Sequence, residues 1–225
     1  MRATPPDPCP PALVRRDILR AIMAAGTIGF ASWRGIGTAA EALMATPSNA
    51  RGPFYPARKP PDSDADLTLV SGRTQRAGGT VLYVSGRVLS LDGGPLASAE
   101  IELWQANAAG RYDHPGDGDS SGALDPNFQG YGRLVTDAQG RYRIKTIKPA
   151  PYSGRTAHLH FNVASSRTRL TTQMFFEGEA LNERDGLYRY FGPEERRAAT
   201  GRPVDRTPEM EQGALAVVWD IVLKT

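Results

Sequence analysis

Residues 99–104 read Ala-Glu-Ile-Glu-Leu-Trp, and this alternation is the clearest fold signal in the chain. Side chains alternate between the two faces of a β-strand, so Ile101 and Leu103 would share one face while the glutamates and Trp104 share the other. Similar short segments recur at residues 80–88, 133–136, 142–145, 157–161, 170–176 and 214–223. Turn-forming residues separate these segments, which is typical of an all-β domain.

About seven strands joined by turns predict an antiparallel β-sandwich with immunoglobulin-like or transthyretin-like topology. Asp137-Ala138-Gln139-Gly140 stands between two of the strand segments and predicts a hairpin. The connection over residues 105–130 is long, and long loops on a rigid sandwich often carry binding groups. Only residues 184–199 have a partly helical pattern, so we expect one short helical segment.

The charge balance is close to neutral, with 27 Lys and Arg residues against 24 Asp and Glu residues and a net charge of +3. Acidic and basic residues are interspersed, and no basic stripe with interleaved aromatic residues occurs. A nucleic-acid partner is therefore not expected.

The N-terminal region is typical of a bacterial export signal. Arg15 and Arg16 precede an uncharged, moderately apolar run at residues 21–33, and small residues follow, with an Ala-x-Ala cleavage site at residues 40–42. The paired arginines resemble a twin-arginine signal. We therefore expect a protein that is exported to the periplasm or secreted.

The chain divides into this leader, residues 1–45, and one β-domain, residues 46–225. Arg34 ends the apolar run well short of the roughly 20 residues that span a bilayer, so no membrane span is expected in the mature form. Cys9 is the only cysteine and lies in the leader, so the domain has no disulfide. Its stability would rest on its hydrophobic core and on any bound metal.

Two of the three histidines lie two residues apart, in Ala-His-Leu-His-Phe at residues 157–161. On a strand, His158 and His160 point to one face, and the three apolar side chains point to the other. Two neutral imidazoles on a rigid strand can bind a metal with little further ordering. The pair alone leaves the identity of the metal open.

Two tyrosines lie in loops that are marked by Pro or Gly: Tyr112 and Tyr152. A phenol ionises near pH ~10 in water, so only a strongly polarising cation keeps it ionised at neutral pH. A hard trivalent ion is the natural partner of a phenolate. Two tyrosines together with two histidines therefore indicate ferric iron more than zinc or copper.

Six segments, in order along the chain, closely resemble the intradiol ring-cleavage dioxygenases, the protocatechuate 3,4-dioxygenase type being nearest. They are residues 52–56, 103–112, 125–128, 146–152, 155–161 and 173–178. The resemblance implies an enzyme that inserts both atoms of O2 into a catecholic substrate. It also implies cleavage between the two hydroxylated carbons, which gives a cis,cis-muconate-type product.

Carried over by position, the resemblance implies that one non-haem Fe(III) is bound by Tyr112, Tyr152, His158 and His160. Tyr152 and His160 would be the axial pair. The resemblance further implies that Tyr152 leaves the metal when the catechol binds and accepts one of its protons.

The resemblance implies roles for four more residues. Arg155 would stabilise charge that develops on the substrate, Gln173 would lie on the oxygen-handling side, and Pro53 and Tyr55 would form part of the substrate pocket. The stretch at residues 153–157 is shorter than in the protocatechuate enzymes, which leaves the choice of catechol open. The family tends to assemble, so the resemblance also implies a homo-oligomer.

Two other functions are weighed against the dioxygenase. His114 could join His158 and His160 in a three-histidine zinc site, although this would leave both tyrosines without a role. Residues 86–96 resemble transthyretin-like modules that bind partners without catalysis. The fold alone does not separate these functions, because function resides in the site.

Overall fold

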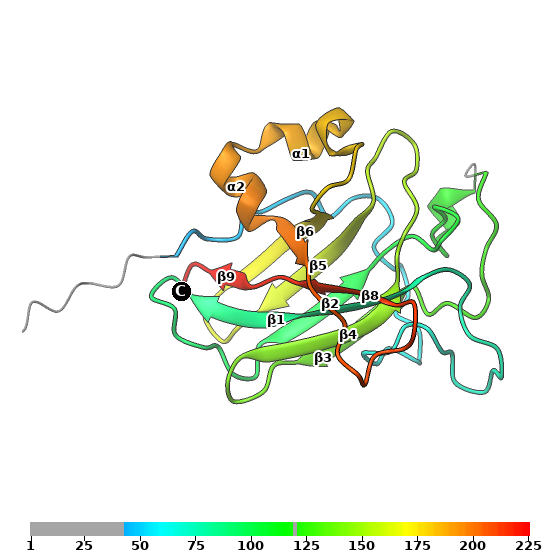
Figure 1. The fold of residues 1–225 in the computed structure, drawn as a ribbon, viewed down its shortest axis with the longest axis horizontal. Helices are drawn as coiled ribbons and strands as arrows, with labels where there is room; N and C mark the ends of the chain where they lie inside the picture. The colour runs from blue at the N-terminus through cyan, green and yellow to red at the C-terminus, as the bar shows by residue number, and fades with distance from the viewer. Residues whose placement is uncertain (1–42, 119–120) are drawn as a thin grey trace, which may run out of the picture. The chain divides into compact units, whose positions relative to one another are not determined.

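The structure, a computed structural model, describes residues 43–118 and 121–225 and is built mainly from β-strands (Figure 1). The predicted export signal, with Cys9, the arginine pair and the cleavage site, lies outside these residues. The described elements are β1 (Val81–Ser90), β2 (Glu100–Trp104), β3 (Tyr131–Val135), β4 (Arg141–Ile147), β5 (His158–Ala164), β6 (Arg169–Phe176), α1 (Gly186–Tyr190), α2 (Pro193–Ala198), β7 (Thr200–Pro203), β8 (Leu215–Val218) and β9 (Ile221–Leu223), with 3-10 turns at Pro115–Asp117 and Asn182–Arg184.

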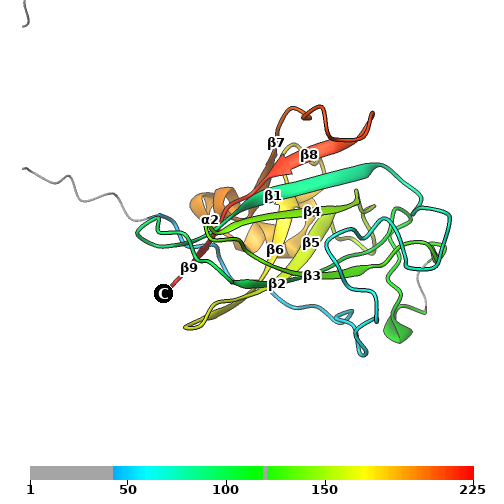
Figure 2. The same ribbon diagram turned by 90° about the horizontal axis from the view of Figure 1, so that it is seen from below.

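Within the described residues, nine strands form one mixed sheet in the order β3-β2-β5-β6-β7-β8-β1-β4, and β9 pairs with β1 beside this path. The predicted antiparallel sandwich is therefore wrong, although the all-β class holds. β1 runs parallel to β8 and β9, and β6 runs parallel to β7. Figure 2 shows β8, β1 and β4 on one side and β2 and β3 on the other, so that the sheet curls into a nearly closed barrel.

The error has a physical cause. Apolar–polar alternation reports which face a side chain occupies, but it does not report the direction of the neighbouring strand. β1 and β8 lie far apart in the sequence, so no tight turn fixes their relative direction. The short β7 has no alternation of its own, and its first two residues pair with β6 while its last two pair with β8. This one strand joins two halves that would otherwise form separate layers.

The predicted hairpin is also wrong. The turn at residues 137–140 forms, but the strands that it joins, β3 and β4, are the two edges of the sheet and are not paired with each other. Residues 63–68 lie between these edges. The backbone N–H groups of Arg133 in β3 and Lys145 in β4 each donate to a carbonyl of this segment at 2.8 Å. The segment therefore covers the opening of the barrel.

The predicted last strand, residues 214–223, is divided into β8 and β9 by Trp219 and Asp220. The Trp219 N–H donates to the carbonyl of Ser85 in β1 at 2.9 Å, so the chain stays attached to β1 across the interruption. A Cβ atom on Gly86 would lie 1.9 Å from the Trp219 carbonyl oxygen. Only glycine allows the two backbones to approach so closely.

The two faces of the sheet have different roles, as the alternation predicts. The inner face fills the barrel with apolar side chains, among them Leu82, Ile101, Leu103, Leu159, Phe161 and Met174. The outer face carries a row formed by Trp104, His160 and Gln173, which are paired across β2, β5 and β6. All three side chains of the row are buried. Polar groups on this face are therefore covered by loops rather than by the core.

The predicted helical segment contains two short helices, α1 and α2, in place of one. Asp185 caps α1, because its Oδ1 accepts hydrogen bonds from the N–H groups of Leu187 and Tyr188 at 2.8 and 3.2 Å. Phe175 of β6 packs in a small cluster with Phe191 and Ala199, which follow the two helices. The helices therefore cover one end of the outer face.

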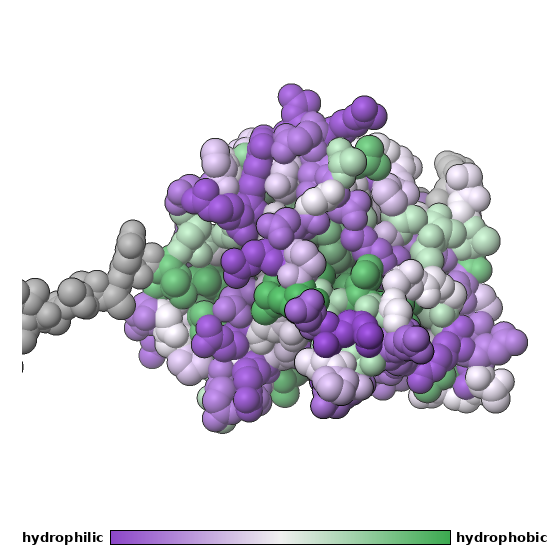
Figure 3. Space-filling view, viewed as in Figure 1, coloured by the Kyte–Doolittle hydropathy of each residue, from purple (hydrophilic) through white to green (hydrophobic). Residues whose placement is uncertain are grey.

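The face shown in Figure 3 is mostly hydrophilic and carries small apolar patches. In the described part of the chain, no helix is both long enough and apolar enough to cross a membrane.

Candidate metal centre

β5 directs both histidines of the pair to the outer face of the sheet, where their Nε2 atoms lie 3.2 Å apart. The Nδ1 of His158 lies 2.6 Å from the carbonyl oxygen of Thr156. A carbonyl only accepts, so Nδ1 carries the proton and the Nε2 lone pair of the neutral ring points toward His160. Both side chains are buried.

The two predicted tyrosines complete the cluster. The Tyr152 hydroxyl lies 3.2 Å from the Tyr112 hydroxyl and 3.4 Å from the Nε2 of His158. Tyr112 is buried, whereas Tyr152 is partly exposed. Four residues from one strand and two loops thus bring two phenol oxygens and two imidazole nitrogens together.

A tight turn holds Tyr152 in place. Tyr152 and Arg155 exchange two backbone hydrogen bonds, of 3.2 and 2.7 Å. The two residues between them have left-handed backbones, with φ of 42° at Ser153 and 76° at Gly154. This is the two-residue turn that joins antiparallel strands most compactly. The short stretch noted in the sequence therefore ties the tyrosine directly to the arginine.

A different device holds Tyr112. Its backbone N–H donates to the Asp117 carboxylate at 2.7 Å, and Asp117 ends the 3-10 turn Pro115–Asp117. The Asp117 side chain is buried, so the loop around Tyr112 is closed on itself.

The donor atoms fit a metal ion. Separations of 3.2 to 3.4 Å between them match ligands that surround a cation at about 2 Å from each. The zinc alternative does not fit, because no group of three or more His, Cys, Asp or Glu side chains is gathered within residues 43–118 and 121–225. The Nδ1 of His114 instead accepts a hydrogen bond from the Gly116 N–H at 3.0 Å.

The site keeps both imidazoles neutral. Burial, together with the positive charge of Arg155, lowers the pKa of His158 to about 4. Burial also lowers the pKa of His160 well below its usual value, and the neighbouring His158 acts in the same direction. A neutral imidazole has the free lone pair that a metal requires.

The pKa values of the two phenols shift upward. Burial, and then the neighbouring Tyr152, raise the pKa of Tyr112, and burial raises the pKa of Tyr152. The protein alone would therefore keep both phenols protonated. Binding as phenolates needs a cation with enough charge to displace the protons, which favours a hard trivalent ion.

Packing fixes the ring of His160. Trp104 stacks on it with ring centres 4.9 Å apart and planes 12° apart. A Cβ atom on Gly52, whose φ is +73°, would lie 3.2 Å from the Cε1 of this ring. The Nδ1 of His160 has no hydrogen-bond partner among the described residues, so contacts rather than a hydrogen bond orient the ring. Sequence reasoning assigned no role to Trp104, although alternation places it on the same face as the histidines.

Arg155 and Gln173, both predicted as catalytic residues, contact each other beside the cluster. One guanidinium nitrogen of Arg155 donates to Gln173 Oε1 at 2.6 Å, and Nε donates to Asp185 Oδ2 at 2.8 Å. Gln173 in turn donates to the Ala50 carbonyl at 2.7 Å. The Asp185 side chain is fully buried and was missed by sequence reasoning, because the residue lies far from Arg155 in the chain.

The two predicted pocket residues, Pro53 and Tyr55, differ in their position relative to the four donor atoms. Tyr55 turns away from the four donor atoms, since its hydroxyl donates to Glu102 at 2.9 Å and its ring packs edge-on against Trp104. Phe54 faces the cluster instead, with its ring centre 4.7 Å from that of Tyr112. Pro53 connects Phe54 to the segment that packs against His160.

Comparison with known proteins gives one consistent family. A family model described as dioxygenase matches residues 50–225. A protocatechuate 3,4-dioxygenase beta chain from Burkholderia cepacia is 40% identical over 184 residues, which cover 76% of this chain and 76% of that protein. A catechol 1,2-dioxygenase from Acinetobacter baylyi is 31% identical over 168 residues, and the match covers 64% of this chain and 50% of that relative.

Solved structures agree with the sequence matches. The dioxygenase domain of a dioxygenase carbohydrate-binding protein fusion from Streptomyces sp. SirexAA-E superposes with a TM-score of 0.60 at 30% identity, covering 80% of this chain and 99% of that one. An intradiol ring-cleavage dioxygenase from Tetranychus urticae gives a TM-score of 0.62 at 19% identity, with coverage of 81% and 95%, and shares the fold.

Proposed function

This chain belongs to the intradiol ring-cleaving dioxygenases, and we propose that it acts through one ferric ion bound by Tyr112, Tyr152, His158 and His160. The convergence of their four donor atoms within 3.2 to 3.4 Å of their neighbours carries this proposal. Members of the family generally depend on non-haem ferric iron. When bound, the ion would act as a Lewis acid and as a template for the catecholate and O2.

In the proposed reaction, a catecholic substrate takes up both atoms of O2 and its ring opens to a cis,cis-muconate-type product. Tyr152 is the better placed of the two tyrosines to meet the substrate, because it is partly exposed while Tyr112 is buried. We assign to its phenol oxygen the proton that the catechol releases. A positioned oxygen within hydrogen-bond reach of the reacting group is what such a transfer requires.

Arg155 supplies a fixed positive charge beside both phenols. Asp185 and Gln173 hold its guanidinium from two sides, so the charge does not have to reorganise during the reaction. A preorganised cation stabilises negative charge that develops on a substrate more effectively than a mobile one. In this proposal Gln173 acts by orienting Arg155.

The side chains beside the four donor atoms would set the choice of catechol. Phe54 packs against both tyrosines, with ring centres 4.7 and 6.2 Å away. The tight turn after Tyr152 leaves little chain to cover that side. We therefore propose that Phe54 and this turn, rather than Tyr55, determine which ring is accepted.

A substrate panel tests the proposed reaction. Catechol, protocatechuate, hydroxyquinol and alkyl- or chlorocatechols would be supplied to the iron-loaded protein, and muconate formation followed by ultraviolet absorbance. We expect turnover of at least one of them, with O2 consumed one to one with substrate. Absence of turnover across the panel by a protein that contains full iron would contradict the proposal.

We also propose that the protein is exported through the twin-arginine route to the periplasm or beyond. The support is the sequence of the leader alone, in which Arg15 and Arg16 precede a weakly apolar run. Fusing residues 1–50 to a reporter and locating it in cell fractions tests this. Replacing both arginines by lysine should retain the reporter in the cytoplasm. A homo-oligomer is proposed on the resemblance alone, and light scattering would test it.

A further inference from the structure

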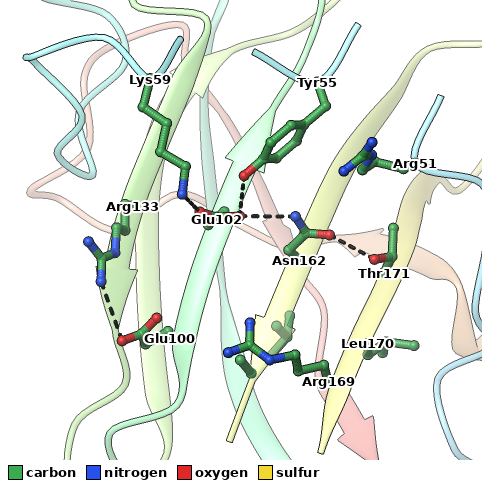
Figure 4. A pocket seen from close by; sticks show the side chains of 12 residues that line it. Arg51, Tyr55, Lys59, Glu100, Glu102, Arg133, Asn162, Arg169, Leu170 and Thr171 are labelled. Carbon is green, nitrogen blue, oxygen red and sulfur yellow. Dashed lines mark hydrogen bonds and ion pairs between the residues drawn. The ribbon is translucent and has the colours of Figure 1, made fainter. Parts of the chain in front are cut away.

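A cavity lies on the same outer face of the sheet as the candidate metal centre. Its volume is about 370 Å³, and Figure 4 shows its charged side chains grouped around Glu102. Glu102, Asn162 and Thr171 form a row across β2, β5 and β6. Each stands two residues from a member of the row Trp104, His160 and Gln173, so the two sites are neighbours along the strands.

The cavity carries an excess of positive charge. Its charged residues are Arg51, Lys59, Arg133, Arg169, Glu100 and Glu102. Four cations against two carboxylates leave an excess of two positive charges.

The excess positive charge resides on the guanidinium groups of Arg51 and Arg169. Lys59 is paired with Glu102, and Arg133 with Glu100 at 3.3 Å. Among the described residues, Arg169 has no side-chain hydrogen bond or ion pair, and Arg51 only lies over the ring of Tyr55 at 5.0 Å. Both point into the cavity region in Figure 4.

The floor of the cavity, formed by Glu102 and Asn162, does not neutralise the charges of Arg51 and Arg169. Glu102 already accepts hydrogen bonds from Tyr55, Tyr131 and Asn162 at 2.8 to 2.9 Å. This network lowers the pKa of Glu102 to about 2 despite the opposing effect of burial. Asn162 is itself fixed by the Thr171 hydroxyl at 2.8 Å. The polar groups of the floor are therefore fixed by hydrogen bonds to one another. The N–H donors of Arg51 and Arg169 are left to bind a ligand.

We propose that this cavity binds a small organic dicarboxylate, with one carboxylate for Arg51 and one for Arg169. A guanidinium matches a carboxylate through two parallel hydrogen bonds. The volume equals roughly a dozen water-sized groups, which suits an organic anion of about ten heavy atoms better than a bare ion. Ring-opened products of the proposed function belong to this class, and only that link rests on the proposed function.

Calorimetric titration of the iron-loaded protein with adipate tests the proposal. We expect saturable binding that the Arg169→Gln and Arg51→Gln variants each weaken by about tenfold or more, because each removes a charge-assisted contact. Arg169→Lys keeps the positive charge but loses the paired N–H donors of the guanidinium. Its affinity for adipate should lie between those of the parent and of Arg169→Gln. Arg73→Gln is the matched control, because Arg73 is exposed and lies outside the cavity, and its binding should equal that of the parent.

Three results would overturn the proposal: no adipate binding, binding unchanged in both arginine variants, or inorganic phosphate binding as tightly as adipate. The last result would indicate a general anion site. Arg169 begins β6 and is exposed, so loss of binding should occur without loss of fold, which circular dichroism would check. The titration involves no turnover, so a failed dicarboxylate site and a failed dioxygenase reaction are separate outcomes.

Discussion

Replacing Asp185 by asparagine should destabilise the protein by about 3 kcal/mol, because it breaks the buried ion pair with Arg155. The Asp185 side chain is 0% exposed and that of Arg155 is 20% exposed, and Nε lies 2.8 Å from the carboxylate. Asparagine keeps an oxygen for the N-terminus of α1 and is as good a capping residue as aspartate. The substitution therefore removes the charge while it leaves the helix cap in place.

The magnitude follows from burial. Removing one partner of a fully buried pair costs roughly 3–5 kcal/mol, and the partial exposure of Arg155 places this pair at the lower end. For a domain of this size, about 1 kcal/mol shifts Tm by roughly 2–4 °C, so we expect Tm to fall by about 6–12 °C. The catalytic effect should be a fall in kcat, since Arg155 would lose one of its two anchors.

Asp137→Asn is the matched control. Its carboxylate accepts from the Arg141 Nε at 2.7 Å, nearly the same geometry, but the two side chains are 42% and 64% exposed. An exposed pair contributes only about 0–1 kcal/mol. Thermal unfolding of the parent and both variants would be compared in one buffer. Equal Tm values for the Asp185 and Asp137 variants would refute the reasoning.

Three further outcomes are expected. In Glu102→Gln, stability should depend less steeply on acid pH than in the parent. The folded pKa of Glu102, about 2, lies below the usual 4.5, so its carboxylate stabilises the fold above pH ~4.5 and this contribution is lost as pH falls toward 2. An urea unfolding series from pH 6 to 3 checks this, and identical slopes for parent and variant would contradict it. Gly52→Ala should weaken iron retention about tenfold more than Gly72→Ala. Both glycines have φ near +75°, but only a Cβ at Gly52 would contact His160. Metal analysis after dialysis measures the difference. Removing iron with a chelator should lower Tm, because an ion that binds only the folded chain stabilises it, and an unchanged Tm would count against a structural contribution of the metal.

The faces of the strands could be predicted from the sequence, because alternation is a local property. Leu159 and Phe161 enter the core and the two histidines leave it, as the pattern at residues 157–161 indicates. Strand direction could not be predicted, because the parallel pairing of β1 with β8 depends on contacts between distant segments. The short β7, which joins the two halves of the sheet, has too few residues to show any period.

In the site, too, local sequence predicted some residues, while others depend on contacts between distant segments. The four proposed ligands could be named from the sequence because two tyrosines with two histidines indicate ferric iron, and the family resemblance selects which ones by position. The residues that position them carry no such chemical signature. Trp104 and Gly52 both pack against His160, but alternation placed Trp104 only on the face of the glutamates, and Gly52 was only part of the segment 52–56. Asp185 had no role assigned from the sequence, and only the fold shows that it both anchors Arg155 and caps α1.

The central claim is that Tyr112, Tyr152, His158 and His160 bind one ferric ion. The most direct measurement combines iron analysis with the visible absorption spectrum of protein expressed in iron-replete cells. We predict about one iron per chain and a burgundy tyrosinate-to-iron charge-transfer band that shifts when a catechol is added. His160→Ala should lose both iron and band. A colourless protein without iron, or a His160→Ala variant that keeps full iron, would contradict the claim.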